Sequence, residues 1–469
     1  MVFASLTFLY IFLPLNLILY YSWNNKSYRN ILLTVMSLVF YAWGEPIWIS
    51  LLIVSALVDY VNGLLVEKWR NTSLAKVPLI STLVVNLGLL ATFKYATFIT
   101  QNVNLVLGTK FDVPSYALPI GISFYSFQTI SYVVDVYKQE VKAQKSFLKF
   151  MLFVSLYHQL VAGPIVRYAH VAHEIDHRII RKSDLSAGIL RFCIGLFKKI
   201  CIANVAGELV QNYLVGDLSS ISVAEAWFGI LMFTIQIYFD FSGYSDMAIG
   251  LGRMVGFHYH ENFNYPYISK SAGDFWRRWH ISLGTFFRDY IYIPLGGNKS
   301  KLYRNLFVVW LLTGLWHGAS WNFIFWGLFW GFLIFIERLF LTKLLSKLPT
   351  FISHIYLLAA VIIGWVFFYF VELDKMGQFF KILFGFSDNS MVSSQFTNVF
   401  QGHIYWLILA LVLCFPIYHW VHAKVRTTSS LIVIKSIPVL TIVFSVTLLF
   451  LSTAMLVGKT FNPFLYFRF

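Results

Sequence analysis

Long charge-free runs of apolar residues constrain the fold of this chain more than any other feature. The run from Asn305 to Ile336 contains no Asp, Glu, Lys or Arg over 32 residues. A continuous helix of that length would measure about 48 Å, whereas the hydrocarbon core of a bilayer is about 30 Å thick. We therefore expect the run to break beside Gly314 and Gly318, the glycines that bracket His317.

Composition places the whole chain in a membrane. Hydrophobic residues make up 58% of the 469 residues and charged residues 12%, against about 25% charged in a soluble domain. We expect an all-α polytopic membrane protein, a single transmembrane domain over residues 1–469. The net charge of +15 is assigned to loops that follow the positive-inside rule, so no nucleic-acid partner is expected. The three cysteines lack CxxC spacing and predict neither a disulfide framework nor a zinc site.

Charge-free runs indicate about eleven spanning helices, and the shorter runs predict re-entrant or interfacial helices in addition. The clear runs are Val2–Trp23, Val77–Phe93, Thr350–Val371, Ile404–Val421 and Ser436–Gly458. The shorter or Gly/Pro-interrupted runs are Ile31–Gly44, Ile47–Leu57, Val113–Val134, Phe150–Val166 and Ala226–Phe239. A further apolar stretch, Leu185–Leu214, is a weaker candidate because it carries four charged residues.

Three polar regions interrupt the spans. Lys138–Lys149 and Arg167–Asp184 are basic, so we place both on the cytoplasmic side. Tyr238–Arg304 mixes charges with aromatic residues. Within it we interpret Gly273–Tyr292 as a half-membrane or interfacial helix whose polar face lines a cavity. The alternative is an amphipathic helix that lies on lipid headgroups.

His317 and His280 are the strongest candidates for chemistry. His317 lies 13 residues past Arg304, roughly 20 Å along a helix, and an ionisable side chain at membrane depth is a functional-site hypothesis by default. A neutral imidazole can take a proton from a hydroxyl or thiol and return it to a leaving group. Four residues could orient the base: Asp274, Arg277, Asp289 and Asn322. We expect an apolar chamber walled by Trp316, Trp321 and Trp326.

Two other motifs carry weaker alternatives. His173–His177 reads HEIDH, which matches the H-E-x-x-H pattern of zinc metalloproteases. It runs directly into basic residues and shows no third ligand downstream, so we expect a loop helix and no bound metal. Asp240–Asp246 places two acids and two serines after a span. These could bind a cation or sugar hydroxyls, or could cap a following helix.

Several motifs together resemble the membrane-bound O-acyltransferase family, in the branch that contains the alginate O-acetylation membrane subunit. Asp274–Leu283, with Pro294–Asn298 after it, resembles the family signature, and Gly314–Ala319 resembles the branch's catalytic-histidine motif. The resemblance continues through three further segments and so covers nearly the whole chain. These segments are Asp59–Gly63, Leu118–Gln128 and Gln159–Arg167.

The resemblance implies a ring of helices around a central pore with His317 at its middle. It implies acetyl transfer from a cytoplasmic thioester, acetyl-CoA or an acyl carrier protein, to an extracytoplasmic polysaccharide. An SGNH-type partner outside the membrane would complete transfer, and the enzyme would need no bound cofactor. Alginate-like exopolysaccharide is the expected polymer, with peptidoglycan or another cell-wall glycan as the alternative, and the bacterial inner membrane is the expected location. The expected substrate-binding residues are Asp274, Arg277, Arg278, Trp316 and Asn322.

The aromatic C-terminus, Phe464–Phe469, adds one more candidate. It resembles the C-terminal motif of small partner proteins in the related D-alanylation system, whose tyrosine is thought to accept the acyl group. By that resemblance, Tyr466 would take the acetyl group with His317 as base, and the alternative is an aromatic plug. A polysaccharide transporter and a membrane metalloprotease remain alternatives of a different class.

Overall fold

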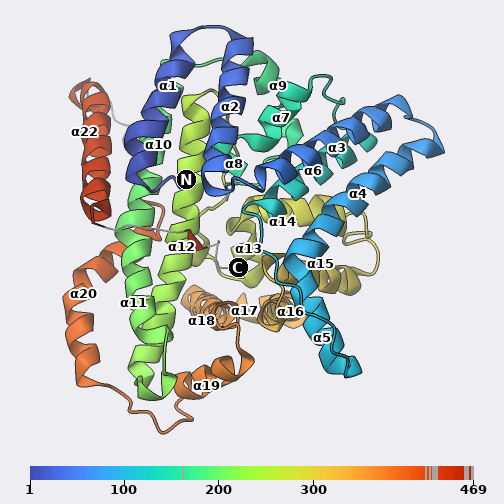
Figure 1. The fold of residues 1–469 in the computed structure, drawn as a ribbon. Coiled ribbons are helices and arrows are strands. Elements are labelled where there is room, and N and C mark those ends of the chain that lie inside the picture. The colour runs from blue at the N-terminus through green and yellow to red at the C-terminus, as the bar shows by residue number, and fades with distance from the viewer. Residues whose placement is uncertain (161–162, 418–419, 422–423, 425–430, 459–463, 466–469) are drawn as a thin grey trace. The chain divides into compact units, whose positions relative to one another are not determined.

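The computed structural model describes residues 1–160, 163–417, 420–421, 424, 431–458 and 464–465, and all regular secondary structure in these ranges is helical (Figure 1). The predicted class, an all-α polytopic membrane protein, is confirmed. Seven helices of the described residues are long and apolar enough to cross a membrane. They are Ile49–Lys68, Ser73–Leu107, Val223–Met254, Trp321–Leu345, Thr350–Tyr369, Ser394–Leu413 and Ser436–Leu456.

The chain forms two compact units. Of the described residues, unit 1 contains those in 1–193 and 244–261 together with 458 and 464–465, whereas unit 2 contains those in 194–243 and 262–457. The helices α10 (Lys182–Phe197) and α12 (Val223–Met254) contribute residues to both units. The expectation of a single transmembrane domain over residues 1–469 stays a prediction.

The helices of unit 1 come mostly from the N-terminal part of the chain. Beyond its shares of α10 and α12, they are η1 (Phe8–Phe12), α1 (Leu13–Ser22), α2 (Lys26–Gly44), α3 (Ile49–Lys68), η2 (Ser73–Ala75), α4 (Lys76–Leu90), η3 (Ala91–Tyr95), α5 (Ala96–Leu107), α6 (Ile122–Tyr137), α7 (Phe147–Ser155), α8 (Tyr157–Leu160) and α9 (Tyr168–His177).

The helices of unit 2 carry the candidate chemistry. Beyond its shares of α10 and α12, they are η4 (Lys198–Ala203), α11 (Asn204–Leu214), η5 (Leu218–Ser220), η6 (Pro266–Ile268), α13 (Ala272–Arg278), α14 (Ile281–Phe287), η7 (Arg288–Tyr292), α15 (Leu302–His317), α16 (Trp321–Ile336), η8 (Glu337–Leu341), α17 (Thr342–Leu345), α18 (Thr350–Tyr369), α19 (Leu373–Leu383), α20 (Ser394–Leu413) and α22 (Leu431–Leu456).

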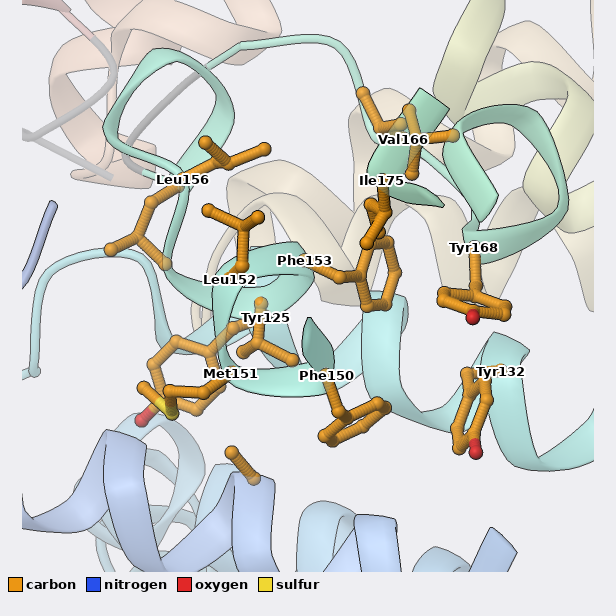
Figure 2. Close-up of a cluster of buried hydrophobic side chains, with 14 of the residues drawn as sticks. Tyr125, Tyr132, Phe150, Met151, Leu152, Phe153, Leu156, Val166, Tyr168 and Ile175 are labelled. Carbon is orange, nitrogen blue, oxygen red and sulfur yellow. The ribbon is translucent and has the colours of Figure 1, made fainter. Parts of the chain in front are cut away.

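Aromatic side chains of α6, α7 and α9 form part of the hydrophobic core of unit 1. Tyr132 packs its ring against Phe150 at 4.7 Å between centroids and edge-on against Tyr168 at 5.1 Å (Figure 2). All three are buried. Aromatic pairs at this spacing stabilise beyond the area that they bury, so they hold the three helices in register.

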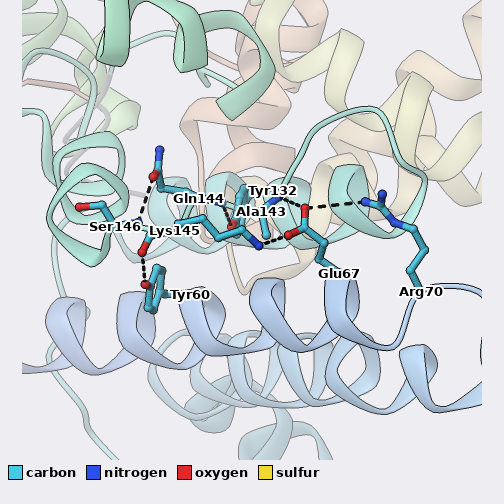
Figure 3. A network of polar contacts seen from close by, with 8 residues as sticks. All are labelled: Tyr60, Glu67, Arg70, Tyr132, Ala143, Gln144, Lys145 and Ser146. Atoms are coloured by element: carbon cyan, nitrogen blue, oxygen red, sulfur yellow. Dashed lines mark hydrogen bonds and ion pairs between the residues drawn. The ribbon is translucent and has the colours of Figure 1, made fainter.

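A polar network fixes the first basic loop, Lys138–Lys149, onto the end of α3 (Figure 3). The carboxylate of Glu67 accepts a hydrogen bond from the backbone N–H of Ala143 at 2.9 Å and pairs with Lys145. The same loop reaches the second basic segment, because Gln144 Nε2 donates to the Tyr168 hydroxyl at 2.8 Å. The two basic segments predicted to share one side of the membrane therefore lie together.

Helix α12 corrects the interpretation of Asp240–Asp246. These residues lie inside a helix that continues to Met254 and do not precede a new helix. The helix tolerates the acids because both are paired. In unit 2 the buried Lys199 forms an ion pair with Asp240, and in unit 1 Arg191 lies 2.7 Å from Asp246.

Candidate active site

His317 is the last residue of α15, and the chain turns there into α16. Residue 318 is extended and α16 begins at Trp321, so the predicted break of the long charge-free run is confirmed. The imidazole of His317 is 5% exposed. Its ring centroid lies 5.0 Å from that of Trp316, 4.8 Å from Trp326 and 5.2 Å from Phe368. Aromatic surfaces therefore surround the base on several sides.

Two glycines let α15 and α16 pack backbone against backbone. A Cβ atom added at Gly314 would lie 2.3 Å from the carbonyl oxygen of Phe323, and one added at Gly327 would lie 2.4 Å from that of Trp310. Neither distance leaves room for a methyl group. Membrane helices can approach each other closely where small residues line the contact. Gly314 therefore allows the close contact between α15 and α16, one helical turn before His317 and the end of α15.

Asn322, at the start of α16, forms hydrogen bonds to the backbone that carries Phe368, one of the aromatic neighbours of His317. The residue is fully buried, and its Nδ2 donates to the backbone carbonyls of Phe367 at 3.1 Å and Phe368 at 3.4 Å. These carbonyls lie near the end of α18, and the Phe368 ring contacts His317. The amide thus ties α16 to α18 and holds one of the aromatic walls.

His280 interrupts the helix predicted over Gly273–Tyr292, so the prediction of one continuous helix was wrong, whereas its half-membrane or interfacial location stays a prediction. The chain forms α13, a kink at His280 and then α14, with the His280 backbone in the left-handed region at φ 44°. The kink is held by a neighbouring segment of the chain. The N–H of Ile281 donates to the Asn262 carbonyl at 2.9 Å, and the N–H of Asn264 donates to the Arg278 carbonyl at 2.9 Å.

The side chain of His280 is buried, with 1% of its surface exposed. Its ring lies 5.9 Å from Trp316 and 4.6 Å edge-on to Phe241 of α12. Nδ1 lies 3.2 Å from Oδ1 of Asn262, whereas Nε2 is buried and makes no hydrogen bond within the described residues. His280 lies outside the seven membrane-crossing helices, and burial lowers its pKa to about 3. The structure thus brings both predicted histidines against one indole, that of Trp316.

The aromatic wall differs in part from the expected one. Trp316 and Trp326 are buried against His317, but Trp321 is 46% exposed and does not wall the site. It follows the turn and faces outward. Trp276 was not predicted as part of this wall. Its ring centroid lies 5.4 Å from that of Trp326, so it packs behind the ring that contacts His317. The residues missed from sequence are Phe241, Asn262, Trp276 and Phe368. Of these, Phe241 lies inside the Asp240–Asp246 motif and Trp276 inside the Asp274–Leu283 motif.

The charged residues of α13 are partly exposed to solvent, whereas His280 and His317 are buried. Asp274 pairs with Arg278 at 3.1 Å and with Arg277 at 3.7 Å. The side chain of Arg277 is 73% exposed and that of Arg278 is 31% exposed. Exposed guanidinium groups can attract anions, and the shared carboxylate offsets part of their charge. Their role in donor binding stays a prediction.

The H-E-x-x-H motif lies on the short helix α9 of unit 1, as predicted. His173 and His177 have ring centroids 5.3 Å apart. Glu174, the residue that would act as base in a metalloprotease, accepts from the backbone N–H of His258 at 3.0 Å and lies 2.7 Å from its Nδ1. Asp176 pairs with Lys149 at 2.6 Å. Both acids of the motif thus have protein partners.

Tyr466 lies outside the described residues. Two residues before it, the ring of Phe464 packs against Tyr244 at 4.9 Å, and both Phe464 and Leu465 are buried. The described part of the aromatic C-terminus therefore packs into unit 1. The acyl-accepting role of Tyr466 stays a prediction.

Comparison with known proteins matches residues 47–373 to the model of the membrane-bound O-acyltransferase family. A probable alginate O-acetylase of Azotobacter vinelandii is 38% identical over all of both chains. A peptidoglycan O-acetyltransferase of Helicobacter pylori is 32% identical over 85% of this chain and 83% of its own. A teichoic acid D-alanyltransferase of Bacillus subtilis is 29% identical over 45% of this chain and 56% of its own. The chain is therefore an O-acyltransferase that belongs to the membrane-bound O-acyltransferase family.

Proposed function

We propose that this enzyme moves an acetyl group from a cytoplasmic thioester, acetyl-CoA, through the membrane for O-acetylation of an extracytoplasmic polysaccharide. The observation that carries the proposal is the pair of buried imidazoles, His280 and His317, that contact the same indole. The similarity to a protein named as a probable alginate O-acetylase over its full length favours an alginate-like exopolysaccharide as the polymer. The similarity to a peptidoglycan O-acetyltransferase makes a cell-wall glycan the alternative.

In the proposed reaction His317 is the base. A hydroxyl oxygen attacks the thioester carbonyl, and the imidazole takes the hydroxyl proton as the new C–O bond forms. The C–S bond then breaks, and the imidazolium returns the proton to the leaving thiolate. The rings of Trp316, Trp326 and Phe368 exclude water from the base, which protects a thioester from hydrolysis. His280 is the second imidazole that a reacting O–H or S–H group can meet.

The assay for this assignment is the O-acetyl content of the polymer from cells that carry His317→Ala. A positioned base contributes about 10²–10⁴-fold to rate, so O-acetylation should fall to about 1% or less of wild type. His403→Ala is the matched control, because His403 lies on α20 and bonds the carbonyl of Val399 in its own helix. More than half of wild-type acetylation in the His317→Ala strain would overturn the assignment. The mass spectrum of the same polymer identifies which glycan is modified.

The donor is proposed to approach near the basic residues of α13. Arg277 and Arg278 carry exposed guanidinium surface that the phosphates of coenzyme A or an acidic carrier protein can meet. Reversing both to Glu should weaken donor binding and reduce its salt dependence. Unchanged donor affinity in a binding titration would exclude this entry site.

The remaining steps follow from the location proposed for the acceptor. We place the enzyme in the bacterial inner membrane, with a separate SGNH-type transferase outside that delivers the acetyl group to the polymer. Tyr466 would carry the acetyl group between the two as an aryl ester. Such an ester is an activated donor, because a phenol of pKa about 10 leaves more easily than a sugar alkoxide.

A further inference from the structure

Asn262 makes an unusual set of contacts beside His280. The residue is fully buried, and its Oδ1 atom accepts from the Ser282 backbone N–H at 3.1 Å and from the Ser282 hydroxyl at 2.9 Å. The same Oδ1 lies 3.2 Å from Nδ1 of His280. One amide oxygen therefore meets the backbone, a hydroxyl and the imidazole together.

These contacts determine which nitrogen of His280 carries the proton. A backbone N–H can only donate, so the Asn262 atom that faces the Ser282 N–H must be the amide oxygen rather than the amide nitrogen. A carbonyl oxygen can only accept, so Nδ1 of His280, 3.2 Å away, donates to it. The Ser282 hydroxyl also lies 3.5 Å from Nδ1, but its hydrogen is directed to Oδ1 at the shorter distance of 2.9 Å, so toward Nδ1 it presents an acceptor. A neutral imidazole has one N–H. The second nitrogen, Nε2, therefore holds a lone pair.

The surroundings of Nε2 agree with that assignment. The atom is buried without a hydrogen-bond partner in the described part of the chain. The imidazole ring of His280 contacts the rings of Phe241 and Trp316. A buried acceptor without a partner is unfavourable, and a catalytic role is one physical reason for such a group to persist in a native protein.

We infer that Asn262 is a positioning residue that holds His280 in the Nδ1–H tautomer and so presents Nε2 to an O–H or S–H group of the substrates. The inference rests on the proposed function for its consequence, the effect on acyl transfer. The tautomer itself can be measured without any substrate. Nε2 accepts a hydrogen bond from that O–H or S–H group, and the proton itself is still taken from the hydroxyl and returned to the thiolate by His317.

A structural role of Asn262 must be separated from this one, because its backbone carbonyl also holds the kink at Ile281. Side-chain variants leave that backbone bond in place. Asn262→Asp keeps an acceptor oxygen toward Nδ1, whereas Asn262→Leu keeps a similar volume and removes the acceptor. Asn264→Leu is the matched control, since Asn264 is exposed and its contacts with Arg278 run through backbone atoms.

The direct readout is the ¹⁵N NMR spectrum of histidine-labelled protein in lipid, because protonated and lone-pair nitrogens of neutral imidazole resonate apart. The His280 signals are assigned by their loss in His280→Gln. Wild type, Asn262→Asp and Asn264→Leu should show the Nδ1–H form, and Asn262→Leu should lose it. In the acetylation assay Asn262→Leu should fall about 10²-fold or more, and Asn262→Asp should stay within about tenfold of wild type.

An Nε2–H form in wild-type protein would overturn the inference, even if Asn262→Leu fails to fold. So would an Asn262→Leu protein that keeps both the Nδ1–H form and its activity. Failure of the proposed function looks different. In that case wild-type cells would transfer no acetyl group while the labelled protein still showed the tautomer that Asn262 selects.

Discussion

Replacing Gly314 with alanine should separate α15 from α16 and displace His317. The added Cβ would lie 2.3 Å from the Phe323 carbonyl oxygen, and real contacts of this kind are not shorter than 3.0 Å, so the helices must part by about 0.7 Å. The obstacle is backbone, which cannot rotate away as a side chain can. Overpacking of this kind costs about 1–3 kcal/mol, of which the higher helix propensity of alanine returns about 0.5–1 kcal/mol.

The expected effect on activity is larger than the effect on stability. A displacement of about 1 Å at a catalytic group can cost about 10²-fold in rate, and His317 lies one helical turn after Gly314. We expect Gly314→Ala to fold, to unfold at a lower temperature in detergent, and to lose about 10–100-fold in O-acetylation of the polymer.

Gly377→Ala is the matched control for the same methyl group. Gly377 lies on α19, is exposed, and has nothing within 4 Å of an added Cβ. The control should be neutral or slightly more stable, with wild-type acetylation. If Gly314→Ala matches this control in both thermal unfolding and acetylation, then the close packing of α15 on α16 does not position the base.

Three further outcomes test other parts of the structure. Asp240→Asn should destabilise the protein by about 3–5 kcal/mol, because it leaves the buried Lys199 without its charged partner; replacing the pair by Leu and Met should recover most of the loss in denaturation experiments. His173→Ala together with His177→Ala should leave acetylation intact, and elemental analysis should find well under one zinc per chain, whereas stoichiometric zinc would support the metalloprotease alternative. Tyr466→Phe should abolish polymer acetylation while the enzyme still binds its donor; normal acetylation would reduce the tail to packing.

The helical class and the break at Gly318 could be predicted because both depend on neighbours in the chain. The length of a charge-free run is compared with a fixed bilayer thickness, and that comparison needs no tertiary contact. His317 could be singled out for the same reason, since the cost of an ionisable group at depth depends on the run around it. The polar segments Lys138–Lys149 and Arg167–Asp184 could be recognised between the apolar runs from their content of basic residues.

The partners of these residues were decided only by the tertiary structure. Asp240 seemed to end a span because its neutralising partner, Lys199, lies 41 positions earlier in the sequence, on η4. The predicted helix over Gly273–Tyr292 breaks at His280 because Asn262 and its neighbours satisfy the backbone there. Phe368 reaches His317 from α18. Periodicity reports which face of a helix is apolar, but not which distant backbone or side chain will meet it, because burial and pairing energies depend on packing that forms only in the folded chain.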